Sequence, residues 1–286
     1  MNFNYKSVSY AKKIDDLLAY YNTSVALSQA LGITRMTLTA WRDHVQKIKL
    51  KNQDKIDLLW CRYIFLPNID GGGKTIKGID LGDFLLEPTV MDKTVRNIAA
   101  GSLEIETGTQ ELDFNAIVLN NIVPNNFQAT MVLEVQNIFH ATQEITQNFQ
   151  VEIDSQKIKD WHKVLMRGLI DNAGKFSTKQ RVLPDVNTQL IHPKDIKEEL
   201  KSWVAEYRNI QNLSDIAKSH YHFEMVHPFS DGNGRIGRLI ILAQCLKIGI
   251  KPPIVNNSNK ALYYVLLEYA KINPTPLAYF FQFCSK

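Results

Sequence analysis

The chain has 286 residues, of which 45% are hydrophobic and 22% charged, and a formal net charge of +4, so it is long enough for two domains with their own cores. No segment has the length and apolarity of a membrane span or of a signal-peptide core, which excludes a membrane protein and predicts a cytoplasmic one. The three cysteines, Cys61, Cys245 and Cys284, are odd in number and lie among apolar residues, so we expect reduced thiols and no disulfide.

The first predicted element is a pair of helices around Gly32. Apolar residues flank this glycine at the spacing of a helix-turn-helix: Leu27, Leu31, Ile33, Leu38 and Trp41. Gly32 suits the turn because glycine tolerates a left-handed backbone, and Thr34 is placed to cap the second helix. Residues 1–66 are therefore predicted to form a small helix-turn-helix-like domain.

This amino-terminal segment is basic. Residues 1–66 contain ten Lys or Arg and five Asp or Glu, a net charge of about +5, whereas the rest of the chain carries about −1. The asymmetry favours a polyanion partner, and DNA is the partner we expect. The candidate contacts are Arg35, Thr37, Thr39 and Arg42 on the second helix, extended by Lys47, Lys49 and Lys51. A protein-docking domain and a solvated basic face are the alternatives.

A connecting segment follows at 67–75, where proline, asparagine and glycine gather. Its end, Gly73-Lys74-Thr75, resembles a phosphate-binding P-loop. Asn68 stands where that loop needs glycine, and no apolar strand leads into it, so this interpretation is excluded. The predicted organisation is a basic domain at 1–66, a linker at 67–90 and a second domain at 91–286.

Two predicted elements lie in the first part of the second domain. Ser102 and Glu106 are four residues apart, which places both on one face of a helix. Residues 180–193 have a proline near each end and β-prone residues among polar ones. This composition predicts a short exposed hairpin, with an ordinary surface loop as the alternative.

The most informative segment is residues 227–238, His-Pro-Phe-Ser-Asp-Gly-Asn-Gly-Arg-Ile-Gly-Arg. Gly232 and Gly234 permit backbone conformations in which the amides around Asn233 converge on an anion. A largely apolar helix starts at Arg235, so this loop lies at the positive end of a helix dipole. The segment is predicted to bind a phosphate mainly through its backbone.

Four side chains of this segment suit phosphate chemistry. Arg235 and Arg238 share one face of the first helical turn and can bind two phosphate oxygens. Asp231 suits a magnesium ion that bridges phosphates, and His227 can accept a proton near neutral pH. A tight turn between two strands is the alternative, and the helical spacing of the apolar residues upstream disfavours it.

The segment matches, at all nine specified positions, the active-site signature of Fic (filamentation-induced) proteins, His-Pro-Phe-x-Asp/Glu-Gly-Asn-Gly-Arg-x-x-Arg. The resemblance extends from about Ser102 to Phe283. It implies transfer of AMP from ATP to a Tyr, Thr or Ser hydroxyl of a protein. By position, His227 resembles the base and Asp231 the magnesium ligand. The backbone of 232–234 resembles the anion hole, and the two arginines resemble the phosphate clamps.

The same resemblance implies regulation. Ser102-x-x-x-Glu106 is similar to the family's inhibitory helix, whose glutamate pairs with the second motif arginine, here Arg238, and suppresses productive ATP binding. Thr107 stands where glycine or asparagine is usual, and Glu104 is a rival acid two residues earlier. Some relatives use the same glutamate to orient a water that removes AMP from a modified protein. Removal of AMP is therefore an alternative activity.

The family pattern also indicates a target flap and a base pocket. The hairpin at 180–193 resembles a flap that lies over the active site and aligns the target segment by main-chain pairing. Tyr263 and Tyr264 occupy positions that the family places beside adenine, and one of them is expected in the core. Lys271 stands where adenine-binding relatives often have asparagine, which leaves the base open.

We therefore expect a mainly α-helical protein, in which a small helix-turn-helix-like domain precedes a Fic-like helical core with one β-hairpin flap. The expected function is a Mg2+-dependent protein adenylyltransferase that Glu106 inhibits and that modifies another protein or itself. One alternative is a DNA-binding regulator that uses the Fic core as a sensor or scaffold. The other is a Fic enzyme with a different donor, although the two motif glycines favour a nucleoside-monophosphate donor over simple phosphate transfer.

Overall fold

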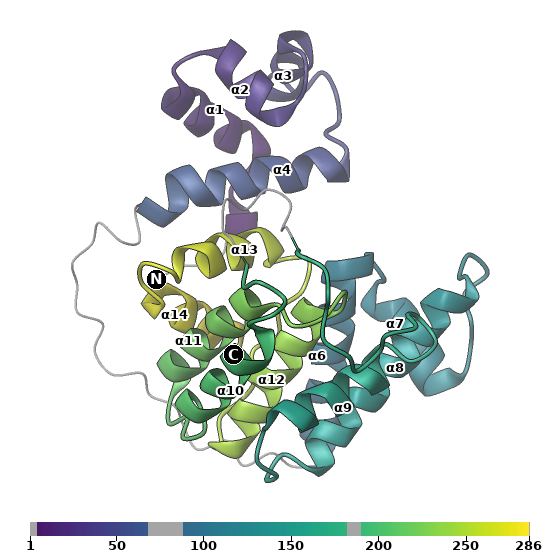
Figure 1. The fold of residues 1–286 in the computed structure, drawn as a ribbon. Coiled ribbons are helices and arrows are strands. Elements are labelled where there is room, and N and C mark those ends of the chain that lie inside the picture. Colours follow the sequence, from purple (N-terminus) through teal and green to yellow (C-terminus); the bar gives the residue numbers. More distant parts are fainter. Residues whose placement is uncertain (1–4, 68–87, 182–189, 286) are drawn as a thin grey trace. The chain divides into compact units, whose positions relative to one another are not determined.

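The computed structural model describes residues 5–67, 88–181 and 190–285. All regular elements in these ranges are helices, which confirms the mainly α-helical class (Figure 1). The expected β-hairpin at 180–193 falls mostly on residues 182–189, outside the described ranges, and the described residues on either side of them form no strand. Within the described part of the chain, every helix is too short or too polar to cross a membrane.

The chain divides into two compact units. Unit 1 comprises Met1–Ile79 and Ser258–Tyr269, and unit 2 comprises Asp80–Asn257 and Ala270–Lys286. The helices of unit 1 are η1 (Tyr5–Ser7), α1 (Tyr10–Tyr21), α2 (Ser24–Leu31), α3 (Arg35–Arg42), α4 (Leu50–Trp60), η2 (Cys61–Phe65) and α13 (Lys260–Tyr269). The helices of unit 2 are α6 (Pro88–Thr107), α7 (Glu111–Asn120), α8 (Ala129–Gln147), α9 (Ser155–Leu165), α10 (Ile196–Glu206), α11 (Leu213–Val226), α12 (Asn233–Lys247) and α14 (Thr275–Cys284).

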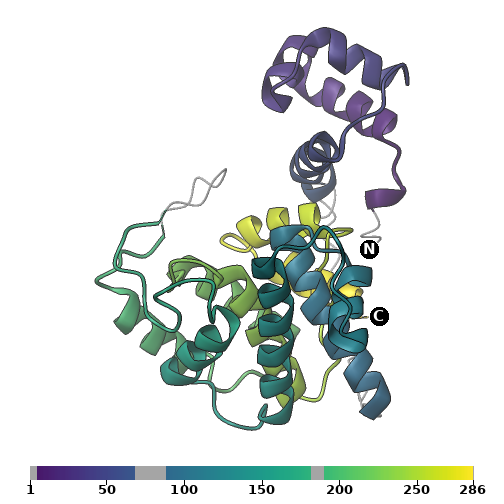
Figure 2. The same cartoon turned by 90° about the vertical axis from the view of Figure 1, so that its right-hand side faces the viewer.

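In unit 1, a tight turn at Gly32 joins α2 to α3. Gly32 has a φ of 66°, in the left-handed region that favours glycine. The Thr34 hydroxyl accepts a hydrogen bond from the Thr37 backbone N–H and caps α3, as its position in the sequence predicts. Buried Leu27 and Trp41 lie on the inner faces of α2 and α3, which pack against α1 (purple in Figure 2).

Helix α13 also belongs to unit 1, although it lies near the carboxyl end of the chain. It packs against α4 and η2 (Figure 1), where Tyr263 is buried and Arg62 forms an ion pair of 2.6 Å with Glu268. Burial of an apolar helix face provides the physical reason for this long-range pairing. The predicted boundaries group this helix with residues 91–286, whereas the structure includes it in the unit that contains the amino terminus.

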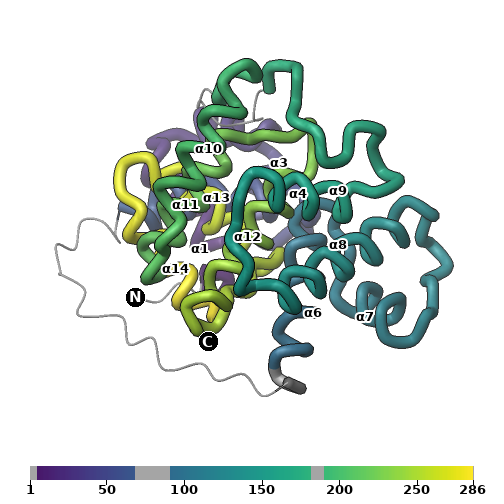
Figure 3. Tube along the Cα trace, turned by 60° about the horizontal axis from the view of Figure 1, so that its bottom comes forward, coloured from purple at the N-terminus to yellow at the C-terminus, as the bar shows by residue number. Residues whose placement is uncertain are grey.

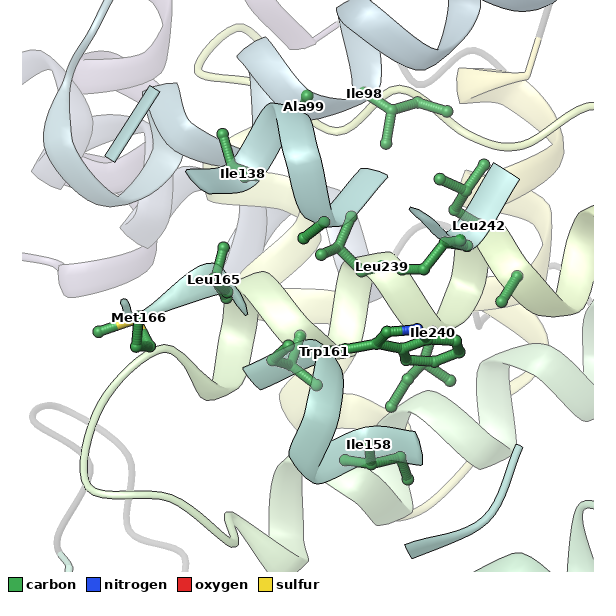
Figure 4. Close-up of a cluster of buried hydrophobic side chains, with 14 of the residues drawn as sticks. Ile98, Ala99, Ile138, Ile158, Trp161, Leu165, Met166, Leu239, Ile240 and Leu242 are labelled. Atoms are coloured by element: carbon green, nitrogen blue, oxygen red, sulfur yellow. The ribbon is translucent and has the colours of Figure 1, made fainter. Parts of the chain in front are cut away.

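Helix α12 forms the centre of unit 2. It contacts α6, α8, α9 and α11, and Figure 3 shows it surrounded by these helices. Its Leu239 and Leu242 pack in a buried cluster with Trp161 of α9 and Ile98 of α6 (Figure 4). A helix that is apolar around most of its circumference must be covered on all sides. The beginning of α12 is therefore held rigidly, together with the loop that precedes it.

Candidate active site

The segment at 227–238 comprises a loop between α11 and α12, residues 227–232, and the first turns of α12. His227 ends α11 with a φ of 46°, and the chain turns until α12 begins at Asn233. The Asn233 side chain closes this loop, because it accepts a hydrogen bond of 2.8 Å from the Phe229 N–H and donates one of 2.9 Å to the Phe229 carbonyl. The side chain of Asn233 is thus structural, and only its backbone N–H is available to a ligand.

His162 of α9 packs against the loop and stabilises it. Its ring stacks on Phe229 with a centroid distance of 3.7 Å, its Nδ1 accepts a hydrogen bond from the Gly174 N–H, and its Nε2 lies 3.0 Å from the Asp231 carbonyl. Burial lowers the pKa of His162 to about 4, so the ring is neutral and donates from Nε2. This role was not predicted from the sequence, because both partners of the His162 ring belong to other segments of the chain.

The start of α12 is suited to an anion. Gly232 immediately precedes the helix with a φ of 75°, and a Cβ there would lie 2.8 Å from the Met166 sulfur. No side chain caps α12, so its first amides have no side-chain acceptor among the described residues. The amides at 233 and 234 and the helix dipole therefore suit an anion, and phosphate binding there stays a prediction.

His227 is half-buried where α11 ends. Burial lowers its pKa to about 4, and the nearby positive charge of Arg181 acts in the same direction. A hydrogen bond with the Glu224 backbone and the charges of Glu106 and Asp231 partly oppose the shift. The imidazole is therefore neutral at pH 7 and able to accept a proton, which is the state that a general base needs.

Arg235 lies between two carboxylates. It is 5% exposed, and its terminal nitrogens lie 3.5 Å from Glu134 of α8 and 3.5 Å from Asp231. Burial raises the pKa of Glu134, whereas Arg235 lowers it. Glu134 is a second site residue that the sequence did not reveal, because nothing in its surroundings on α8 marks it.

Asp231 is the candidate magnesium ligand. Its side chain is 62% exposed, and its Oδ1 accepts a hydrogen bond of 2.6 Å from the Gly232 N–H. The described ranges contain no group of three or more His, Cys, Asp or Glu side chains placed to hold a metal. A single accessible carboxylate still fits magnesium, because this ion keeps several waters and commonly takes substrate phosphates as its other ligands.

Arg238 makes the densest set of polar contacts in the site. It is 4% exposed and donates from Nε to the Ser102 hydroxyl at 2.9 Å and from a terminal nitrogen to the Ser102 carbonyl at 3.1 Å. It also forms a 2.7 Å ion pair with Glu106, whose side chain is 34% exposed. The two residues of α6 singled out by their spacing thus both contact the second motif arginine.

The structure also distinguishes Glu106 from its rival acid. Glu104 accepts a hydrogen bond from the Asn257 backbone N–H at 3.2 Å, away from Arg238. Helix α6 ends at Thr107, whose hydroxyl donates to the Leu103 carbonyl, and Gly108 follows with a φ of 77°. The glycine that ends the helix therefore comes one position later than in the resembling pattern.

The two tyrosines predicted beside the base lie on α13 in unit 1. Tyr263 is 1% exposed, which confirms that one of the pair is a core residue, and Tyr264 is 36% exposed. Their ring centroids are 5.2 Å apart. Contact of either ring with a base stays a prediction.

Residues 152–245, which contain the whole loop and most of α12, match the model of the Fic/DOC family. The chain contains a Fic/DOC domain. This finding confirms the resemblance inferred from the motif.

Curated relatives of this domain carry the name protein adenylyltransferase. The chain is 32% identical to protein adenylyltransferase fic-1 of Caenorhabditis elegans over 87 residues, which cover 29% of this chain and 17% of the relative. It is 24% identical to protein adenylyltransferase Fic of Nematostella vectensis over 205 residues, which cover 61% of this chain and 47% of the relative. The chain thus spans less than half the length of these relatives.

The fold of the Fic/DOC domain is also found among solved structures. The crystal structure of a Fic domain containing signaling protein from Bacteroides thetaiotaomicron aligns with a TM-score of 0.64 and 18% identity. The alignment covers 70% of this chain and 88% of that chain. At this identity the similarity establishes a shared fold.

Replacement of His162 by alanine is expected to destabilise the Fic/DOC domain by about 3 kcal/mol, because it opens a cavity under Phe229 and leaves the Gly174 N–H without its acceptor. Urea unfolding measures the loss. His140→Ala, on the exposed surface of α8, is the control and should change the free energy of unfolding by about 0.5 kcal/mol or less. An equal effect of the two substitutions would contradict the supporting role.

The Fic/DOC domain is expected to lose stability as pH falls from 6.5 toward 4. Burial lowers the pKa values of His162 and His227 to about 4 and that of His220 to about 3, all below the ordinary value of 6.5. In this window the unfolded chain binds more protons than the folded one, so each histidine lowers the free energy of unfolding by about 1.4 kcal/mol per pH unit.

Glu224 acts in the opposite direction. Burial raises its pKa from 4.5 to about 7, so the folded state binds the extra proton between these values and this contribution to stability is lost as pH rises. The contribution of Glu224 to the free energy of unfolding is smaller than the combined contribution of the three histidines. The midpoint of urea unfolding, measured at pH 6.5 and at pH 4.5, tests this expectation. We expect a lower midpoint at pH 4.5, and a larger decrease between the two pH values in Glu224→Gln than in wild type. A midpoint that rises toward pH 4.5 would contradict the assignment of buried neutral histidines.

Proposed function

We propose that the chain is a protein adenylyltransferase, which transfers AMP from ATP to a Tyr, Thr or Ser hydroxyl of a protein. The observation that carries the proposal is the loop between α11 and α12. There a half-buried, neutral His227 is followed by an uncapped helix start with Arg235 and Arg238 in its first two turns. The names of the curated relatives support the same activity.

The reaction uses these groups in defined roles. The target hydroxyl attacks the α-phosphorus of ATP, the bond from that phosphorus to its bridging oxygen breaks, and pyrophosphate leaves. His227 accepts the hydroxyl proton while the new P–O bond forms. The amides at the start of α12 and the guanidinium of Arg235 stabilise the negative charge on the phosphates, so catalysis consists largely of positioning and charge neutralisation.

Asp231 is the residue that would hold magnesium in this scheme. Its exposed carboxylate adjoins the amides that face the phosphates. A bound magnesium ion supplies positive charge that offsets the charge of the leaving pyrophosphate. Asp231 also positions the loop, because its Oδ1 already accepts the Gly232 N–H.

Activity would be controlled at Arg238. Its buried guanidinium is satisfied by Glu106 and Ser102, and a γ-phosphate would need the same positive charge. Glu106 therefore competes with the productive nucleotide for one partner. An unpaired buried charge is costly, so ATP must replace Glu106 as the partner of Arg238. The partial exposure of Glu106 gives its carboxylate access to water when it is displaced.

The proposal is tested by the chemical form of the product. Full-length Glu106→Gly protein is incubated with ATP and magnesium, and its peptides are analysed by mass spectrometry while pyrophosphate is measured. We expect AMP on a Tyr, Thr or Ser side chain with release of one pyrophosphate per adduct. A phosphate adduct with release of ADP, or no adduct at all, would overturn the proposal. AMP loss from the modified protein on addition of wild type would assign removal to the same site.

A further inference from the structure

Helix α3 of unit 1 has one buried and one exposed face. Leu38 and Trp41 are buried, whereas Arg35 and Thr39 are exposed and Met36 is 85% exposed. Arg35 and Met36 lie in the first turn of the helix, immediately after the turn at Gly32 and the Thr34 cap. In a helix-turn-helix this part of the second helix contacts base edges.

The basic residues among positions 5–66 fall into two groups. The first group forms ion pairs: Lys6 and Lys13, which share Asp57, Lys12 with Asp16, Arg42 with Asp43, and Arg62 with Glu268. The second group is exposed and forms no ion pair with the described residues: Arg35, Lys47, Lys49, Lys51 and Lys55. The exposed charges of this second group thus lie at the start of α3, in the segment between α3 and α4, and on α4.

We propose that unit 1 binds duplex DNA, with the first half of α3 in the major groove. Arg35 carries the fork that matches a guanine edge, and the exposed side chain of Met36 offers apolar contact to a thymine methyl group. Lys47, Lys49 and Lys51 contact phosphates and fix the register without reading sequence. This proposal is independent of the transferase activity.

The structure narrows the contacts expected from the sequence. Arg42 donates from Nε to Asp43 at 2.9 Å, and the charges of Asp43 and Asp15 raise its pKa, so its positive charge is largely compensated. Thr37 is partly covered and lies 2.9 Å from the Thr34 hydroxyl in the cap of α3. Arg35 and Thr39 remain as candidates from the original four, and Met36 joins them.

The first experiment measures affinity of the full chain for a duplex of about three helical turns and mixed sequence, by fluorescence anisotropy over a range of salt concentrations. We expect binding at low salt that weakens steeply as salt rises. The variant Lys47→Gln/Lys49→Gln/Lys51→Gln should reduce the slope of log affinity against log salt by about 3, since each phosphate contact contributes about 0.9. The matched control is Lys194→Gln/Lys197→Gln/Lys218→Gln, which removes three exposed charges from unit 2.

The second experiment selects preferred sequences from a randomised duplex pool. Arg35→Ala should lower affinity for the selected duplex about 10- to 100-fold. Arg35→Lys should keep the salt dependence but lose the base preference, because an ammonium group lacks the guanidinium fork. No binding at low salt up to ~100 µM protein, equal affinity for single-stranded DNA, or equal losses in the two triple variants would overturn the proposal. Circular dichroism of each variant confirms that the exposed substitutions leave the fold intact.

Discussion

Replacement of Glu106 by glycine is expected to raise the rate of AMP transfer from ATP about 10- to 100-fold. The physical reason is the 2.7 Å ion pair between Glu106 and Arg238, which holds the guanidinium that a nucleotide phosphate requires. Without the carboxylate, the place that Glu106 now occupies at the guanidinium of Arg238 is open to a nucleotide phosphate. The rate is measured as incorporation of label from ATP marked at the α-phosphate.

Glu104→Gly is the matched control for this experiment. It removes the same side chain from the same helix, and both substitutions cost helix α6 about 1 kcal/mol in helix propensity. Glu104 contacts the Asn257 backbone N–H and not Arg238, so its loss should leave the rate within about twofold of wild type. A comparable rise in both variants would attribute the effect to loosening of α6 and would contradict direct competition at Arg238.

Replacement of His227 by alanine is expected to reduce transfer about 100- to 10,000-fold, the contribution typical of a positioned general base. ATP affinity should change little, because the phosphates are held by the start of α12 and by the arginines. The wild-type rate should fall on acidification only near pH 4 to 5, since burial lowers the pKa of His227 to about 4. Titration calorimetry and the pH dependence of labelling measure these two quantities.

His222→Ala provides the comparison for His227. His222 lies on the same helix, α11, with Glu199 at 3.9 Å and Glu206 at 3.6 Å. Its removal should leave transfer within about twofold of wild type. Full activity of His227→Ala would remove this residue from the chemical step and leave only a positioning function for the loop.

The catalytic loop could be predicted in detail because its chemistry lies in one contiguous segment. The spacing of His227, Asp231 and the two arginines is fixed by the turn and by the first turns of α12, so local sequence specifies their relative placement. His162 and Glu134 were missed because their partners are 69 and 101 residues away in the chain. Such pairs become apparent only when the packing of α8 and α9 against α12 is known.

The contact between α6 and α12 shows a second feature that the sequence could not predict. The four-residue spacing of Ser102 and Glu106 indicated a shared helix face, but it did not decide between Glu106 and Glu104. Packing of the core selects Glu106, because the buried Ser102 and Leu103 orient α6. In this orientation Glu106 pairs with Arg238, and Glu104 accepts a hydrogen bond from the Asn257 backbone. The rotation of a helix about its own axis is a property of the assembled core.

The placement of α13 could not be predicted from composition. Its sequence suits any apolar groove, and the chain reaches it after the entire catalytic segment. In the structure it completes the core around α4 and η2, where Tyr263 is buried and Glu268 meets Arg62. Boundaries drawn from composition assume that a domain is continuous in sequence, and unit 1 is not.

Transfer of AMP from ATP is tested most directly by comparing ATP labelled at the α-phosphate with ATP labelled at the γ-phosphate. Each nucleotide is supplied to Glu106→Gly protein and to the double variant Glu106→Gly/His227→Ala. We expect Glu106→Gly to incorporate label from the α position and none from the γ position, and we expect the double variant to lose this label. Label from the γ position, or equal α labelling of the two proteins, would contradict this expectation.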